Sequence, residues 1–322
     1  CRGLCVSGNI PPVDLSDVTA RRERDSITLR EIRMASKVTL RTLNALRDRR
    51  EPAVFITAYD YPTATFAERA GVDMILVGDS AAMTMMGLPN TLGIGMEEMI
   101  VFVRSVCRAA RRTFVVGDLP FLSYQPSDES AVLNAGRFVA EGCDAVKCEG
   151  GARIAPRVRA MVNAGINVMG HLGLTPQNIG QLSGYRVQGK TRAAVDQLVD
   201  DALALQDAGA FAVLLEAMPA VAAEYVRERV DLLVYGIGAG PHVDGQLVIS
   251  HDILGNFVGD IAPRFVKQYA RLGAQIEQVF RSYAEDVRNS CFPAPEHCYP
   301  IDAFHEAAIQ ECRPQTVVEP HA

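Results

Sequence analysis

The sequence of 322 residues has no apolar run of about 18 residues and no basic run with interleaved aromatic side chains. The first absence excludes a membrane-spanning helix, because such a helix needs about 20 apolar residues to cross the hydrocarbon layer. The second argues against a nucleic-acid surface, as does a formal net charge of -6 from 32 basic and 38 acidic residues. We therefore expect neither a membrane nor a nucleic acid among the partners of this protein.

The eight cysteines form no CxxC pair. They occur at positions 1, 5, 107, 143, 148, 291, 298 and 312, without the dense framework of a small secreted protein. A zinc site would need Cys or His partners at close spacing, which Cys143 and Cys148 lack. We expect reduced, mostly buried thiols and a cytoplasmic location.

Hydrophobic residues make up 48% of the chain, which is enough for one large core. Residues 1–33 hold six Arg against five Asp or Glu, so they fit neither a signal peptide nor an acid-poor transit sequence. We expect a poorly ordered appendage over 1–33, one domain over 34–300 and a tail over 301–322. An amphipathic helix capped by Ser36 and ending at Asp48 is expected before the main fold.

From Pro52 onward, short apolar strands alternate with helical segments. A glycine followed by one spacer residue repeatedly stops a helix before a strand, at Gly71, Gly142, Gly165 and Gly209. The pattern predicts a (β/α)8 barrel rather than an open doubly wound sheet, whose first turn would carry a Gly-rich fingerprint. The expected strands cover residues 54–58, 74–78, 114–118, 145–149, 167–171, 211–215, 232–236 and 246–249.

After Asp252 the chain turns helical. Pro263 is expected to open a helical extension that runs through Arg288, with apolar residues at three-to-four spacing. The last twenty residues are polar and are expected to be irregular.

The stretch 144–151, DAVKCEGG, is typical of a short buried strand. Alternate side chains of a strand share a face, so Lys147 and Glu149 project together, opposite to Val146 and Cys148. Burying a cation and a carboxylate without partners costs several kcal/mol, so this face needs a counter-charge, a metal or a ligand. Two interpretations stay open here: the floor of an active site, or a satisfied Lys-Glu pair at a barrel rim.

Ionisable groups occur at the ends of five expected strands. Each of these groups alone is often a helix cap or a hydrogen-bond partner. The catalytic groups of a (β/α)8 barrel, however, lie at the carboxyl ends of the strands. Four carboxylates at one such mouth repel one another unless a cation lies among them. Hard oxygen ligands without a Cys or His triad favour Mg2+. The five residues are Asp79, Asp118, Glu149, His171 and Glu216.

A magnesium ion beside Lys147 suits a 2-oxo acid, which can chelate the ion while a base removes a proton next to the carbonyl. Glu216 has apolar neighbours in Leu214, Leu215 and Met218. This setting suits proton transfer, although an ordinary rim carboxylate fits the pattern equally well.

Two other motifs are weaker. Ser250, His251 and Asp252 are sequence neighbours and are not expected to face one another as a catalytic triad. The glycine-rich stretch 236–240 follows the seventh expected strand, where barrels often hold a phosphate, but it could equally be a tight turn.

Many ordered motifs resemble the ketopantoate hydroxymethyltransferase family, from about Met34 to Tyr299. They are TAYDYPTA (57–64), VGDS (77–80), DLPF (118–121), VKCEGG (146–151), GHLGLTPQ (170–177), GYRVQG (184–189), VLLEAMP (213–219), GIGAGPHVDGQ (236–246) and FPAPEH (292–297). The resemblance implies a phosphoenolpyruvate/pyruvate-type barrel, one Mg2+ per subunit and a homodecamer. It also implies hydroxymethyl transfer from 5,10-methylenetetrahydrofolate to 3-methyl-2-oxobutanoate, giving 2-dehydropantoate in pantothenate biosynthesis.

The same resemblance implies a role for each matching residue. Asp79 and Asp118 would bind Mg2+ and, through it, the substrate, with Glu149 completing the metal shell directly or through water. The remaining assignments are Ser80 and Lys147 as binders of the oxo acid, His171 as a polar contact near the reacting carbonyl, and Glu216 as the catalytic base.

The loop after the second strand departs from the family pattern. This chain has Ala81-Ala82 where the family usually has Leu-Gly, and Gly93 where it usually has Pro. An alanine at position 82 would penalise a positive φ there by about 1 kcal/mol. These changes motivate one alternative, a Mg2+-dependent lyase or aldolase that acts on another 2-oxo acid. A second alternative is a ring-forming homologue without turnover, against which the intact Asp79, Asp118, Lys147, Glu149 and Glu216 argue.

Overall fold

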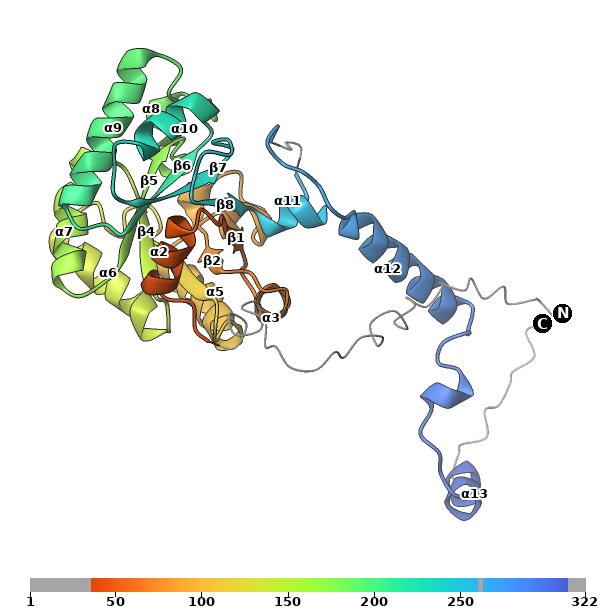
Figure 1. The fold of residues 1–322 in the computed structure, drawn as a ribbon. Helices are drawn as coiled ribbons and strands as arrows, with labels where there is room; N and C mark the ends of the chain where they lie inside the picture. The colour runs from red at the N-terminus through yellow and green to blue at the C-terminus, as the bar shows by residue number, and fades with distance from the viewer. Residues whose placement is uncertain (1–35, 260–262, 312–322) are drawn as a thin grey trace, which may run out of the picture.

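The computed structural model describes residues 36–259 and 263–311, and the expected appendage over 1–33 lies outside these ranges. Eight parallel strands form a closed barrel, in which β1 pairs with both β2 and β8 (Figure 1). The predicted barrel is therefore confirmed, with strand boundaries within two residues of the expected ones. The strands are β1 Ala53–Thr57, β2 Met74–Val77, β3 Phe114–Asp118, β4 Ala145–Glu149, β5 Val168–Gly173, β6 Ala212–Glu216, β7 Leu233–Ile237 and β8 Gly245–Val248.

Helices pack around the barrel and connect successive strands, except β7 and β8, which a loop joins. The four junction glycines that follow α3, α6, α7 and α9 all have a positive φ, between 79° and 111°, which is why glycine ends these helices. The helices are α2 Leu40–Asp48, α3 Tyr61–Arg69, α4 Ala81–Thr84, α5 Met96–Ala109, α6 Asp128–Ala140, α7 Ala155–Asn163, α8 Ile179–Leu182, α9 Arg192–Asp207, α10 Ala220–Arg227, α11 Ser250–Leu254, α12 Leu272–Arg288 and α13 Ala303–Glu311. Short 3-10 turns are η2 Thr91–Gly93, η3 Ala152–Ile154, η4 Pro176–Asn178 and η5 Pro295–His297.

The strands lie between two apolar cores, one inside the barrel and one between the strands and the surrounding helices. Inward residues such as Phe55, Met74 and Tyr235 fill the barrel, whereas Val146 and Cys148 of β4 pack outward against the helices. The predicted alternation along β4 is confirmed, because Lys147 and Glu149 continue the inward face that begins with Ala145. Apolar packing fills one end of the barrel and leaves the inward positions of the other end to polar groups.

Several boundaries differ from the sequence expectations. Thr39, not Ser36, caps α2, because its hydroxyl accepts a hydrogen bond of 3.3 Å from the Thr42 amide. α12 begins at Leu272 rather than at Pro263, and α13 forms within the segment expected to be irregular.

The loop after β2 also differs. Ala82 lies in α4 with no positive φ, so the expected penalty does not arise there.

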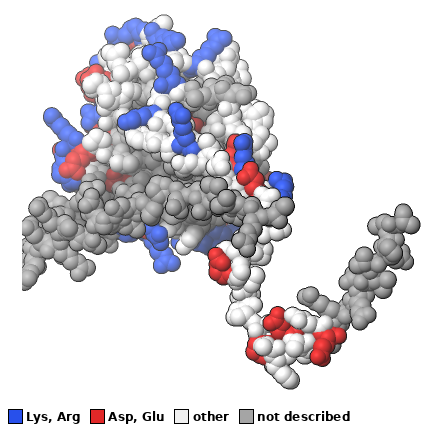
Figure 2. Space-filling view, turned by 90° about the vertical axis from the view of Figure 1, so that its right-hand side faces the viewer, with Lys and Arg blue, Asp and Glu red and all other residues white. Residues whose placement is uncertain are grey.

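The C-terminal extension projects from the barrel. α12 has no buried residue, and α13 lies beyond it (Figure 1). On the face that Figure 2 shows, Lys and Arg lie mainly over the barrel and are interspersed with acidic groups, whereas the projecting end around α13 displays acidic side chains.

Among the residues described, no helix is long and apolar enough to cross a membrane. Of the cysteines in those ranges, Cys107, Cys143 and Cys148 are free thiols, and the last two are buried. Cys291 and Cys298 are exposed, so the expectation of mostly buried thiols is wrong for that pair. Exposure follows from their position on the projecting extension.

The two weaker motifs form local structures. Gly238 and Gly240 have a positive φ of 63° and 83°, which agrees with a tight turn after β7. Ser250 Oγ lies 3.4 Å from His251 Nδ1, closer than expected, and also 3.4 Å from Thr57 Oγ1 at the end of β1. This buried serine therefore joins α11 to β1.

Candidate active site

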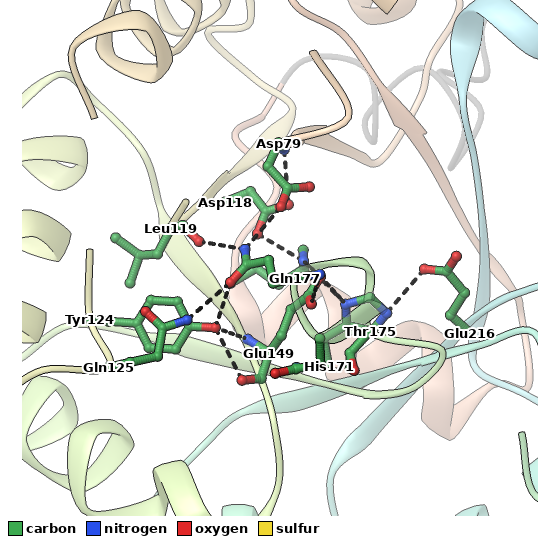
Figure 3. A network of polar contacts seen from close by, with 12 residues as sticks. Asp79, Asp118, Leu119, Tyr124, Gln125, Glu149, His171, Thr175, Gln177 and Glu216 are labelled. Carbon is green, nitrogen blue, oxygen red and sulfur yellow. Dashed lines mark hydrogen bonds and ion pairs between the residues drawn. The ribbon is translucent and has the colours of Figure 1, made fainter. Parts of the chain in front are cut away.

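The five ionisable side chains predicted from the strand ends meet at the carboxyl end of the barrel (Figure 3), and Lys147 lies among them. Of these six side chains, five are almost completely buried, and Glu216 is the most exposed, with 16% of its side chain accessible. They come from β3, β4, β5, β6 and the residue two after β2, namely Asp118, Lys147, Glu149, His171, Glu216 and Asp79.

Lys147 is a buried cation with partners on three sides. Its Nζ lies 2.8 Å from Asp118 Oδ1, 3.5 Å from Glu149 Oε1 and 3.2 Å from His171 Nδ1. Burial alone would lower the pKa of Lys147, but the carboxylates of Asp118, Glu149 and Asp79 raise it above its ordinary value. The lysine is therefore charged, and it neutralises part of the acidic cluster.

His171 links the two ends of this cluster. Its Nδ1 lies 3.1 Å from Glu149 Oε1, and its Nε2 lies 3.1 Å from Glu216 Oε2. Burial lowers the pKa of His171, and the charge of Lys147 lowers it further. A neutral ring can accept a hydrogen bond from Lys147 at Nδ1 and present an N–H at Nε2 toward Glu216.

Asp79 and Asp118 form a close acidic pair. The Asp79 amide donates to Asp118 Oδ2 at 3.1 Å. Burial raises the pKa of both carboxyl groups; for Asp118 the charge of Asp79 is the next largest cause. Asp118 Oδ1 is buried without an aligned hydrogen bond, although Lys147 lies nearby. A divalent cation bound to this pair would compensate both carboxylates for the hydration that they lose on burial.

Glu149 does not join this pair in a three-carboxylate cluster. Its Oε1 faces Lys147 and His171, and its Oε2 accepts from the Gln177 amide at 2.9 Å. Within residues 36–259 and 263–311, no group of three His, Cys, Asp or Glu side chains has the geometry to hold a metal. Both carboxylate oxygens of Glu149 therefore have protein partners in this structure, and its role in the metal shell, directly or through water, stays a prediction.

Gln177 is the central residue of the site that sequence reasoning missed. Its side-chain amide donates to Asp79 Oδ2 and to the Leu119 carbonyl, each at 2.9 Å, and its Oε1 accepts from Tyr124 at 2.9 Å (Figure 3). Together with its backbone contact to Glu149, this joins β4 to the segments that follow β2 and β3 through one residue. The motif GHLGLTPQ contained this residue, but a glutamine has no chemistry of its own that would have singled it out.

Replacing Gln177 by Ala should lower the free energy of unfolding by about 2–4 kcal/mol, because buried partners on Asp79, Leu119 and Tyr124 lose their hydrogen bonds. Urea unfolding at fixed protein concentration measures the change. The matched control is Gln197→Ala, an exposed residue of α9, which should change the value by less than about 0.5 kcal/mol. Equal effects of the two substitutions would contradict a structural role for the Gln177 network.

Ser80 lies beside the acidic pair. Its Oγ is 2.7 Å from the hydroxyl of Tyr59, whose pKa is raised to about 12, mainly by burial. Tyr59 follows β1 and was quoted within a motif but not as a site residue. The pair orients the Ser80 hydroxyl at the start of α4.

A closed barrel with a buried lysine, a histidine and four carboxylates at its carboxyl mouth defines an enzyme of the (β/α)8 class. The sequence model of the family described as ketopantoate hydroxymethyltransferase matches residues 37–295. The chain belongs to this family of transferases, as its motifs predicted.

Relatives support the same assignment. A 3-methyl-2-oxobutanoate hydroxymethyltransferase of Syntrophobacter fumaroxidans is 48% identical over 82% of this chain and 93% of its own length. That of Pyrobaculum islandicum is 50% identical over 77% and 94%. Among solved structures, 2,3-dimethylmalate lyase, a PEP mutase/isocitrate lyase superfamily member, shares the fold with a TM-score of 0.51 and 16% identity, covering 84% of this chain and 95% of that one.

Proposed function

We propose that this protein transfers a hydroxymethyl group from 5,10-methylenetetrahydrofolate to 3-methyl-2-oxobutanoate, with water as the third reactant and 2-dehydropantoate and tetrahydrofolate as products. The observation that carries the proposal is the placement of Glu216 across His171 from a buried Lys147 and an acidic pair, all at one mouth. The names of the family and of its relatives supply the substrate class.

A single Mg2+ fits the donor set of Asp79 and Asp118, because both are buried oxygen ligands and Asp118 Oδ1 lacks an aligned hydrogen bond. Glu149 would contact the ion indirectly, through a water molecule in the coordination shell of the ion. When bound, the ion supplies electrophilic stabilisation of the charge that develops on the keto oxygen of the substrate.

The side chains of the protein perform the remaining steps. The ammonium of Lys147 and the hydroxyl of Ser80 bind the oxygens of the oxo acid. Glu216 accepts the C3 proton, since it lies at the open side of the site and 3.1 Å from the Nε2 of His171. His171, neutral because of burial and Lys147, holds this carboxylate in place and contacts the reacting carbonyl.

The first test needs no folate. The protein is incubated with Mg2+ and 3-methyl-2-oxobutanoate in D2O, and the C3 proton is followed by NMR. We expect exchange that disappears when EDTA removes the metal, and conversion to 2-dehydropantoate once methylenetetrahydrofolate is added. Exchange without transfer would reject the transferase, and turnover of a different 2-oxo acid alone would favour the lyase or aldolase alternative.

We further propose a cytoplasmic homo-oligomer. Free thiols such as Cys107 support a reducing compartment.

The surface of α12 supports association. This helix carries an apolar stripe on one side, and each residue of the stripe is between 43% and 68% exposed. On the barrel, Val54 on the outer side of β1 is half-exposed, and β8 is followed by only the five-residue α11. A second copy of the chain is the partner that would cover the stripe, formed by Ile276, Val279, Phe280, Tyr283 and Val287.

Replacing Phe280 by Asp should weaken this association, raising the dissociation constant of the oligomer at least about tenfold, because a charge would enter an apolar contact. Size-exclusion chromatography with light scattering over a dilution series measures the effect. Gln278→Asp on the other side of α12 is the control and should leave the mass unchanged. A monomeric wild-type protein, or equal behaviour of both variants, would reject this contact.

A further inference from the structure

An aromatic ring overhangs the mouth of the barrel and has no assigned role. Tyr185 lies in the loop between α8 and α9 and is 48% exposed. Its hydroxyl donates to the thioether sulfur of Met83 at 3.7 Å, although the two residues are 102 positions apart. The contact joins the loop after β5 to α4, which follows β2, and so spans one side of the opening.

The loop is fixed relative to the catalytic groups. Ser183 and Gly184 have a positive φ of 54° and 103°, which turns the chain back sharply after α8. The Gln188 amide then donates to the carbonyl of Ala217, the residue directly after Glu216, at 2.9 Å. Tyr185 therefore lies on a segment whose far end is anchored beside the candidate base.

The electrostatic surroundings agree with this placement. Partial burial raises the pKa of Tyr185, and the carboxylates of Asp79, Glu216 and Glu149 raise it further. Charges from three different strand ends thus act on one phenol, which agrees with the position that its contacts to Met83 and the anchored loop give the ring.

The two halves of the site differ in chemistry. The buried half holds Lys147, Asp118 and their partners, which suits a small charged acid. The open half presents the half-exposed ring of Tyr185 next to the sulfur of Met83, and the exposed Met85 and Met86 directly follow α4. A flat heteroaromatic ring gains most from such a surface, through stacking on the phenol ring and contact with polarisable sulfur.

We propose that Tyr185 and Met83 form the stacking platform for the reduced pterin ring of the one-carbon donor. This inference rests on the proposed function and names the place of the second substrate. A pterin stacked there lies on the exposed side of Glu216, from which its one-carbon unit can reach the carbon that this residue deprotonates.

The test uses Tyr185→Ala and Tyr185→Phe in the full-length, Mg2+-loaded protein. Loss of the ring should raise the KM for methylenetetrahydrofolate at least about tenfold, whereas the KM for the oxo acid and the folate-free C3 exchange should stay within about twofold of wild type. Tyr185→Phe keeps the ring and should restore the donor KM. Circular dichroism verifies that both variants are folded.

A second readout uses the absence of tryptophan from this chain. Tyr185→Trp places a single indole at the platform, and its fluorescence should fall saturably when tetrahydrofolate is added. Tyr299→Trp, at a fully exposed position on the C-terminal extension, is the control and should show no saturable change.

The possible outcomes distinguish a failure of this inference from a failure of the proposed function on which it rests. A wild-type protein that exchanges the proton but does not transfer the carbon rejects both. A wild-type protein that transfers, with an unchanged donor KM in Tyr185→Ala, rejects only the platform. Exchange that falls in parallel with transfer in Tyr185→Ala would mean that the ring contacts the oxo acid instead, and would overturn the proposal as well.

Discussion

Replacing Glu216 by Gln should slow exchange of the C3 proton of 3-methyl-2-oxobutanoate by about 10^3-fold, within the range expected for loss of a general base. Glutamine has nearly the same shape and can still lie against His171, but it cannot accept a proton at neutral pH. NMR in D2O with Mg2+ measures the rate without folate. Transfer to the folate-dependent product should fall in parallel, because the carbon nucleophile forms only after the proton has left.

The control for this substitution is Glu224→Gln, which removes a partly exposed carboxylate from α10 and should leave exchange within about twofold of wild type. If Glu216→Gln also exchanged the proton at the wild-type rate, Glu216 would be an ordinary carboxylate at the barrel rim. If Asp79→Asn abolished the exchange of the C3 proton and Glu216→Gln did not, the base would be another residue of the cluster.

Replacing Lys147 by Met should destabilise the fold by about 3–5 kcal/mol, the usual cost of removing one partner of a buried ion pair. Asp118 and Glu149 would then stay buried without their cation, 2.8 Å and 3.5 Å from the position it occupies. Urea unfolding in EDTA, at equal protein concentrations, isolates this effect from metal binding and from association.

A double substitution distinguishes charge from packing. Lys147→Met with Asp118→Asn removes the cation and its nearest carboxylate, so it should be less destabilised than the sum of the two single variants by about 1–3 kcal/mol. Additive effects would mean that Lys147 contributes mainly through its methylene groups. A loss below about 1 kcal/mol in Lys147→Met would mean that water reaches the cluster and screens it.

Much of the fold could be predicted from the sequence, because local signals and the tertiary structure agree. The junction glycines end helices through positive φ, and a period of two along β4 places Lys147 and Glu149 on the inward face. The same logic predicted that His171 and Glu216 would share one mouth. The helix caps were less predictable, since Ser36 and Thr39 are equally good candidates until the chain entering α2 is placed.

The polar network of the site could not be predicted in the same way. Gln177 and Tyr124 matter because loops from different βα units bring them together, 53 positions apart in the chain. The position of the Glu149 carboxylate has the same origin, since its Oε2 accepts a hydrogen bond from the Gln177 backbone amide. Such contacts depend on tertiary geometry, which residue type and spacing do not encode.

The partial exposure of Glu216 has a consequence for isotope measurements. A base sealed from solvent returns the abstracted proton to the same carbon, and this internal return would hide enolisation from any label in the medium. With 16% of its side chain open to water, Glu216, the proposed base, would lose that proton to the bulk while the second substrate is absent. Isotope washout should therefore report the first chemical step directly, whatever the rate of the steps that follow it.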